Sequence, residues 1–190
     1  MEGYTPEDRE LLREMRRVRR HLKGKRLWWG LIIWAFLSAI VGFILLNRFF
    51  TLAVAHGPGM GETAPAESVV LFQRLREGQK PAYGDVILIE HEESLDIKRV
   101  AAAGGDEVGQ DEHGQLTVNG VAIPGYDAPW TADLPEQPFV VPEGEYFVLG
   151  DRYDLSVDSR SQMFGTVPED SVVGTATYII WPAYRIGAVR

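Results

Sequence analysis

Residues able to take part in acid, base or nucleophilic chemistry gather in three short segments of this 190-residue chain. They are the glycine-rich stretch 57–63, the apolar stretch around Lys98, and the polar stretch 150–160. A lysine acts as a general base only where burial or a nearby cation disfavours its ammonium form. The valine and alanines at 100–103 would give Lys98 such an apolar setting, so this lysine is a candidate base.

Simpler structural interpretations exist for the same residues. Lys98 would then be a partly buried cation paired with Asp154 or Asp158. The run Asp158-Ser159-Arg160 would fix a turn through side-chain hydrogen bonds. His56 could be a substitute base, although its place just after the apolar segment favours a role in capping an interface.

The composition excludes several kinds of site. The chain has no cysteine, which rules out a thiol nucleophile, a disulfide and a Cys-ligated zinc. His56, His91 and His113 show no metal-ligand spacing, so we predict neither a metal nor another cofactor. After residue 47 there are 10 Lys and Arg against 22 Asp and Glu, which argues against nucleic acid as a partner.

A membrane-spanning helix is predicted over 27–46, where 20 consecutive residues carry no charge. At about 1.5 Å per residue they cross a hydrocarbon core of about 30 Å. Residues 1–26 hold nine Lys and Arg, which places them in the cytoplasm and 47–190 outside the plasma membrane. A basic amphipathic helix in 1–26 would bind anionic membrane lipid. Two alternatives stay open: a secretory signal cleaved after Ala53-Val54-Ala55, and a buried helix of a soluble protein.

Residues 47–190 are predicted to form one mainly β domain, because short apolar runs alternate there with Gly, Pro and Asp. Asn119-Gly120 is a hairpin signal, since both positions of such a turn must tolerate positive φ. We expect an antiparallel β sandwich or barrel-like fold, with 106–140 as its loop-rich part. The expected strands are SVVLFQRL, DVILIEH, LDIKRVAAA, QLTV, VAI, EYFVLGD and VVGTATYIIW.

The three chemical segments resemble, in the same order, the sequence boxes of type I signal peptidases, the leader peptidases of peptidase family S26. Residues 57–63 resemble G-x-S-M-x-P-T, with Gly59 in place of Ser and Glu62 in place of Pro. Residues 84–86 and 98–106 resemble the boxes G-D-V and K-R-V-x-x-x-x-G-D. Residues 150–160 resemble G-D-N-R-D-N-S-x-D-S-R, with departures at Arg152, Tyr153 and Leu155.

The resemblance implies acyl transfer by a Ser-Lys dyad in a membrane-bound endopeptidase. Lys98 matches the general base, Gly59 the place of the nucleophile, and Ser156 the serine that orients the lysine. The backbone N–H at the nucleophile's position helps to bind the oxyanion. The other matched positions are expected to brace the site or to bind substrate: Asp151, Asp158 and Arg160 in the first role, Gly57 and Met60 in the second.

Glycine has no oxygen to attack a carbonyl, so Gly59 removes the covalent route of the family. Glu62 could add to the impairment by placing a carboxylate near Lys98, which would favour the ammonium form. A displaced nucleophile would have to come from a nearby hydroxyl: Thr63, Ser68 or Ser156.

We therefore expect a catalytically impaired relative that binds signal peptides or pilin-type precursors at the membrane surface and assists surface-protein or pilus assembly. A peptide can add to a sheet edge through backbone hydrogen bonds, and this needs no nucleophile. Two alternatives stay open: an active signal peptidase with a displaced nucleophile, and a structural relic that binds no peptide. The sequence leaves the oligomeric state undetermined.

Overall fold

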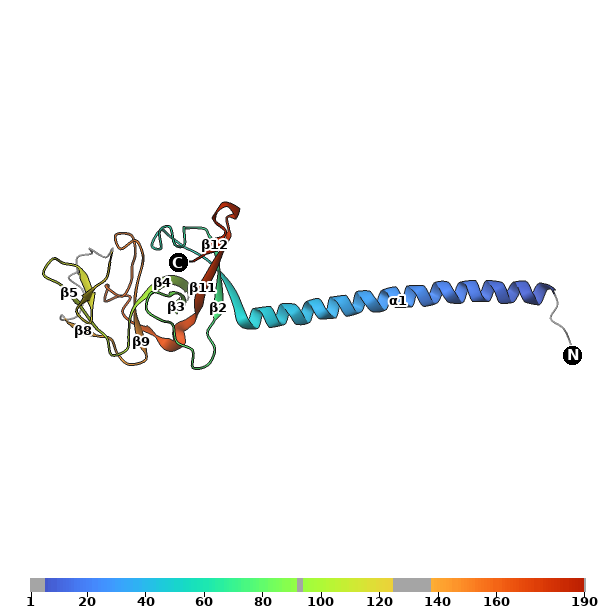
Figure 1. Ribbon diagram of the computed structural model, residues 1–190, viewed down its shortest axis with the longest axis horizontal. Coiled ribbons are helices and arrows are strands. Elements are labelled where there is room, and N and C mark those ends of the chain that lie inside the picture. The colour runs from blue at the N-terminus through green and yellow to red at the C-terminus, as the bar shows by residue number, and fades with distance from the viewer. Residues whose placement is uncertain (1–5, 92–93, 125–137, 190) are drawn as a thin grey trace. The chain divides into compact units, whose positions relative to one another are not determined.

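The computed structural model describes residues 6–91, 94–124 and 138–189, and for 6–14 and 16–27 it describes the backbone alone. The chain divides into two compact units, Met1–Asn47 and Arg48–Arg190. The first unit contains most of one long helix, and the second contains the strands (Figure 1).

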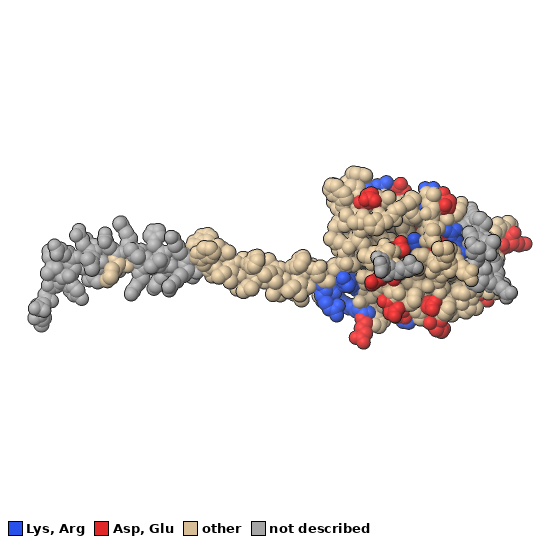
Figure 2. All heavy atoms as spheres, turned by 180° about the vertical axis from the view of Figure 1, so that it is seen from behind, with Lys and Arg blue, Asp and Glu red and all other residues tan. Residues whose placement is uncertain are grey.

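Helix α1 runs without a break from Pro6 to Phe49. Its portion Trp28–Phe49 is long and apolar enough to cross a membrane, and none of that portion is buried inside the protein. Figure 2 shows this length of helix without acidic or basic side chains along most of its course. A backbone in lipid must satisfy its hydrogen bonds internally, which a continuous helix does. The alternative of a buried helix in a soluble protein does not fit, because no part of Trp28–Phe49 is buried among the described residues.

The second unit is built from antiparallel strands. Those of the large sheet have the order β1-β2-β11-β3-β4-β9-β10, with β12 on β11, and those of the small sheet have the order β7-β6-β5-β8. Every strand pair in the described part of the chain is antiparallel. The strands are β1 Phe50–Val54, β2 Val69–Arg74, β3 Val86–His91, β4 Ser94–Ala103, β5 Glu107–Gln110, β6 Leu116–Val118, β7 Val121–Ala122, β8 Phe139–Val140, β9 Glu145–Leu149, β10 Val167–Pro168, β11 Val172–Trp181 and β12 Gly187–Ala188. Two short 3-10 helices, η1 Glu169–Ser171 and η2 Ala183–Arg185, flank β11.

Alternating side chains of the strands fill three apolar clusters. One lies under β1, β2 and β11 and includes Phe72; a second, around Phe147, joins β4 and β9 to the small sheet. The third lies under β3 and β9 and includes Ile87 and Ile89. Because β4 contributes to all three, its residues are held from both faces.

The predicted fold class, a mainly antiparallel β domain after one N-terminal apolar helix, is confirmed. The hairpin at Asn119-Gly120 is confirmed as well, with φ of 51° and 77° and with Val118 paired to Val121.

The loop-rich part expected at 106–140 also holds the small four-stranded sheet, and its residues 125–137 lie outside the described residues. Ala53 and Ala55 of the small-x-small run are buried in the first core cluster, and the choice between a retained anchor and a cleaved signal stays a prediction.

Candidate active site

The glycine-rich stretch forms a tight loop after β1. Gly57 and Gly61 have φ of 75° and 52°, the left-handed region that favours glycine, and the N–H of Gly61 donates to the carbonyl of Pro58 at 2.9 Å. Met60 is 4% exposed and packs in the first core cluster. The loop that carries Gly59 is therefore fastened to the core at the next residue.

Successive side chains of strand β4 point to opposite faces of the sheet, which separates the core residue Ile97 from Lys98. Ile97 joins the first core cluster, whereas Lys98 turns to the opposite face and lies across from Ile87 of β3. Lys98 is only 8% exposed, and its Nζ lies 5.5 Å from the centroid of the Phe164 ring. This is within the range of a cation–π contact.

The two carboxylates considered as partners of Lys98 are bound by arginines instead. Arg160 Nε donates to Asp158 Oδ1 at 2.8 Å, and Arg152 Nη2 donates to Asp154 Oδ2 at 2.9 Å. The interpretation of Lys98 as a cation paired with Asp154 or Asp158 is therefore wrong.

The run Asp158-Ser159-Arg160 holds together the loop that follows β9. Asp158 also accepts the N–H of Gly150 at 3.0 Å, Ser159 Oγ accepts the N–H of Val148 at 2.9 Å, and Arg160 Nη2 donates to the carbonyl of Tyr153 at 2.8 Å. Asp158 and Arg160 are 1% and 5% exposed. The side-chain hydrogen bonds expected of a turn-fixing Asp158-Ser159-Arg160 run are therefore present.

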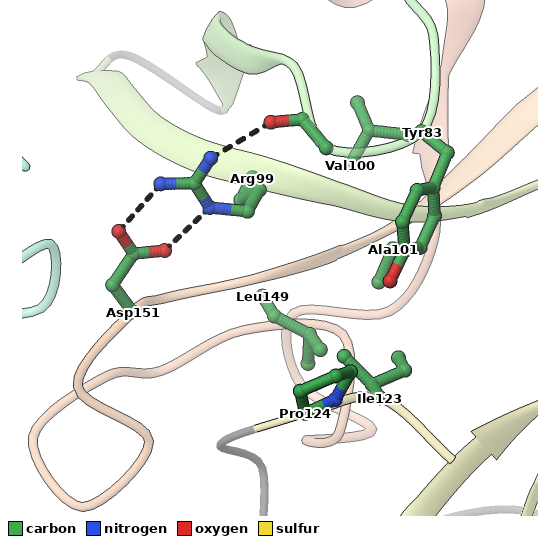
Figure 3. Close-up of a pocket in the computed structure, with 9 residues that line it drawn as sticks. Tyr83, Arg99, Val100, Ala101, Ile123, Pro124, Leu149 and Asp151 are labelled. Carbon is green, nitrogen blue, oxygen red and sulfur yellow. Dashed lines mark hydrogen bonds and ion pairs between the residues drawn. The ribbon is translucent and has the colours of Figure 1, made fainter. Parts of the chain in front are cut away.

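A second ionic contact ties this loop to β4. Arg99 donates to both carboxylate oxygens of Asp151, at 2.8 and 2.7 Å, and to the carbonyl of Gly84 at 2.8 Å. Thr63 Oγ1 donates to the same carboxylate, so Asp151 connects three separate segments. The Arg99–Asp151 pair closes one end of a cavity of about 400 Å³ (Figure 3). Its other walls are mostly apolar: Tyr83, Gly84, Val100, Ala101, Ile123, Pro124 and Leu149.

A separate groove of about 360 Å³ brings Gly59, Lys98 and Ser156 together. The carbonyl of Gly59 accepts the N–H of Arg152 at 2.8 Å, so the glycine loop and the loop after β9 touch here. The remaining lining residues are His56, Gly57, Pro58, His91, Ser94, Asp96, Leu155, Val157, Met163 and Phe164. Side chains far apart in sequence thus converge on one open site.

Ser156 lies directly against Gly59. Its Oγ is buried and has no hydrogen-bond partner among the described residues. A Cβ placed at Gly59 would lie 3.3 Å from this Oγ, and one placed at Gly150 would lie only 2.1 Å from it. Ser156 therefore fills the space between two glycines, and it makes no hydrogen bond to Lys98.

Glu62 points away from the lysine, contrary to expectation. It is 85% exposed and its carboxylate receives Arg185 Nη1 of η2 at 2.5 Å. The hydrogen bond from Arg185, and then the charge of its guanidinium, hold the pKa of the Glu62 carboxyl below its usual value. Glu62 therefore acts on the position of the loop rather than on Lys98.

Within residues 6–91, 94–124 and 138–189, no three His, Asp or Glu side chains lie close enough together to hold a metal ion. His91 stacks on Phe164 with ring centroids 4.6 Å apart, which is an apolar contact at the groove wall. The prediction that no cofactor is needed stays a prediction.

The model of the family described as signal peptidase, peptidase S26, matches residues 28–181 of the chain. The chain belongs to the S26 signal peptidase family. It is 33% identical over 149 residues to subunit 1b of the mitochondrial ATP-independent inner membrane protease of Arabidopsis thaliana, covering 76% of this chain and 78% of that protein. It is 27% identical over 169 residues to signal peptidase I of Bacillus licheniformis, covering 80% and 88%.

A crystal structure of a signal peptidase I from Enterococcus faecalis is 30% identical, with a TM-score of 0.41. The match covers 52% of this chain and 98% of that one. Together with the apolar helix α1, family membership indicates a membrane-anchored signal peptidase homologue. The domain boundaries at 26 and 46 stay predictions.

The predicted site residues of this family member fall into two groups. Gly57, Gly59, Lys98 and Ser156 line the groove. Met60 does not line the groove, because it is buried in the first core cluster. Asp151 forms an ion pair with Arg99, and Asp158 forms one with Arg160. Their functional roles stay predictions.

Several groove residues had no predicted role, among them His91, Asp96 and Phe164. The alternation of β4 could have found Asp96, because residues two apart on a strand share a face and Asp96 precedes Lys98 by two. No sequence signal identifies the stacking of His91 on Phe164, since it depends on the path of the loop after β9.

Proposed function

We propose that this signal peptidase homologue binds the signal-peptide region of exported precursors in the Gly59–Lys98–Ser156 groove, while cleaving them poorly or not at all. The observation that carries the proposal is the convergence of these three residues on one open groove without a side-chain oxygen at position 59. Precursors that carry signal peptides are the partners that membership of the family implies.

A strand edge without a described pairing partner supports peptide binding. On one side, β4 pairs with β3 from Ser94 to Arg99. On the other side, β9 pairs with β4 only from Arg99 onward, and no described strand pairs with Ser94–Lys98 there. An extended peptide can add to such an edge through main-chain hydrogen bonds, with alternate side chains entering the groove.

The chemistry of position 59 supports weak or absent cleavage. Acyl transfer by the family's route needs an oxygen nucleophile within hydrogen-bond reach of its base. Gly59 retains a backbone N–H that can polarise a carbonyl, but it has no atom that can attack one. Loss of the nucleophile lowers the rate of a measured protease by about six orders of magnitude.

Ser156 favours a second candidate function, which is slow cleavage with a displaced nucleophile. Its hydroxyl lies beside Gly59 and lacks a hydrogen-bond partner among the described residues. However, the same oxygen exposes less than 1 Å² of surface, so a substrate carbonyl can reach it only after the loop after β9 moves. We therefore rank binding above cleavage.

The wider role proposed is at the outer face of the membrane. Residues 1–26 lie in the cytoplasm, in contact with anionic lipid, and the β domain lies outside. The proposed partners are exported precursors that carry a signal peptide. Pilin-type precursors are one specific example, and by binding them the protein would assist surface-protein or pilus assembly.

Equilibrium titration tests the binding function. Full-length protein in lipid nanodiscs is titrated with a fluorescent signal-peptide segment, and saturable binding is expected. The matched control is the same peptide with alternate backbone amides methylated, which keeps every side chain but removes strand hydrogen bonds; about tenfold weaker binding is expected. Equal binding of both peptides, or no saturable binding, would contradict addition to β4.

A further inference from the structure

Asp96 is a half-buried carboxylate on the wall of the groove, and nothing in the proposed chemistry uses it. It lies on β4 with Ser94 and Lys98, and because the three are two residues apart they share a face and line the groove together. Its cross-strand neighbour on β3 is Ile89, which is almost fully buried. Asp96 is thus a charge placed against apolar surface.

This carboxylate has no partner in the described part of the chain, where it accepts no hydrogen bond and forms no ion pair. Among the described residues Lys98 forms no ion pair with Asp96, and its Nζ lies 5.5 Å from the centroid of the Phe164 ring. A carboxylate that is partly removed from water without a donor is costly and gains from any cation that reaches it. Asp96 is also the sole carboxylate among the described residues lining the groove.

The position of Asp96 on β4 indicates that a cationic side chain of a bound peptide could reach its carboxylate. It lies within Ser94–Lys98, the part of β4 that has no strand on its β9 side. In a peptide added to this edge, one side chain would lie directly opposite Asp96, with the two Cβ atoms about 4.5–5.5 Å apart. The peptide residues on either side of it would point to the other face.

We propose that Asp96 selects a lysine or arginine side chain at one position of the bound peptide. The inference rests on the proposed peptide binding and adds its charge specificity. The excess of acidic residues over the whole β domain also draws cationic peptides toward it.

The test is a scan with synthetic peptides on the full-length protein in nanodiscs. A set of eight-residue peptides of Ala and Ser carries a single lysine, placed at a different position in each peptide. Each lysine peptide is compared with a control peptide that has Nε-acetyllysine at the same position. At one position only, the lysine peptide should bind at least about fivefold more tightly than its acetylated control. The preference should shrink as salt is raised.

Three variants separate the explanations. Asp96→Asn should remove the lysine preference while the neutral peptide still binds, and Asp96→Lys should prefer glutamate at the same position. Asp170→Asn, which removes an exposed carboxylate outside the groove, should change nothing. Neutral peptides that bind without any lysine preference, or a preference that survives in Asp96→Asn, would overturn the role of Asp96 and leave peptide binding intact. If no peptide binds, the proposed function and this inference fail together.

Discussion

At the scale of single residues, the site places Gly59, which has no side-chain oxygen, against Ser156, whose hydroxyl has no hydrogen-bond partner among the described residues. The sequence predicted Gly59, Lys98 and Ser156 as site residues, and all three line one groove, while their functional roles stay predictions. It could not predict how they pair. Lys98 lies over a ring instead of a carboxylate, because Arg160 and Arg152 bind the two aspartates, and side-chain pairing depends on loop paths that no spacing encodes.

Gly59→Ser alone is expected to restore at most weak cleavage. A Cβ at position 59 would lie 3.3 Å from Ser156 Oγ, so the new side chain must displace its neighbour before it can face Lys98. A misplacement of about 1 Å in a nucleophile can cost about 10²-fold in rate. Cleavage of a labelled precursor is measured for wild type, Gly59→Ser and Gly59→Ala. Full activity in Gly59→Ser would contradict this view of a crowded site.

Asp158→Ala is expected to lower the free energy of unfolding by about 3–5 kcal/mol, because it removes the carboxylate that balances the charge of the buried Arg160 guanidinium. Chemical denaturation of the full chain in detergent measures the change. Asp154→Ala removes the exposed partner of Arg152 and serves as the control; it should leave the unfolding midpoint unaltered. Equal effects of the two substitutions would show that burial does not determine the importance of these pairs.

At the scale of elements, the strands with long apolar runs were predictable, and so was the short β6–β7 hairpin because of its turn signal. The strands β2, β3, β4, β9 and β11 coincide with apolar runs, whose length and alternation carry the signal. The strands β8, β10 and β12 span two residues each and exist because a longer neighbour pairs with them. The open edge of β4 was equally unpredictable, since it depends on where β9 begins to pair.

The Glu62–Arg185 pair is expected to fasten the glycine loop to η2 in a pH-dependent way. The pKa of Glu62 is lowered in the folded protein, so the pair contributes at neutral pH and is lost as pH falls through that lowered value, below the usual 4.5. Glu62→Gln should accelerate hydrogen exchange of the Gly61 and Thr63 amides about twofold to fivefold at pH 6, and by a smaller factor at pH 3.

The control for this loop is Glu67→Gln, which removes an exposed carboxylate from the same connection between β1 and β2. It should leave the exchange rates unaltered at both pH values. Faster exchange in both variants would mean that the loop responds to net charge rather than to the contact with Arg185.

At the scale of the whole molecule, the charge distribution predicts orientation. Nine Lys and Arg precede the apolar stretch, and an acidic domain follows it. The basic segment is therefore expected to stay in the cytoplasm. Protease added to intact spheroplasts should digest the β domain and spare the N-terminal segment. A protected β domain with a cleaved N-terminal segment would reverse the assignment.

The overall organisation of the molecule could be predicted from the sequence more completely than its individual short strands. The apolar helix, the β domain and the family followed from composition and from three ordered boxes. Two strands of the small sheet, β6 and β7, were predicted from the hairpin at Asn119-Gly120, whereas β5, β8 and their assembly into a separate sheet were not, because turn residues dominate the pattern there. The contribution of the small sheet to the second core cluster is a tertiary property of Val108, Leu116 and Phe139.

The most direct test of the central claim, that this homologue binds a precursor without cleaving it, is the mass of the precursor that it has bound. Tagged full-length protein in nanodiscs is incubated with a precursor carrying a signal peptide, captured, and the bound material is measured by intact-mass spectrometry after minutes and after hours. The precursor should be recovered bound and at full mass at both times. A shortened product that accumulates with wild type and is absent with Lys98→Ala would show a working dyad and contradict the claim.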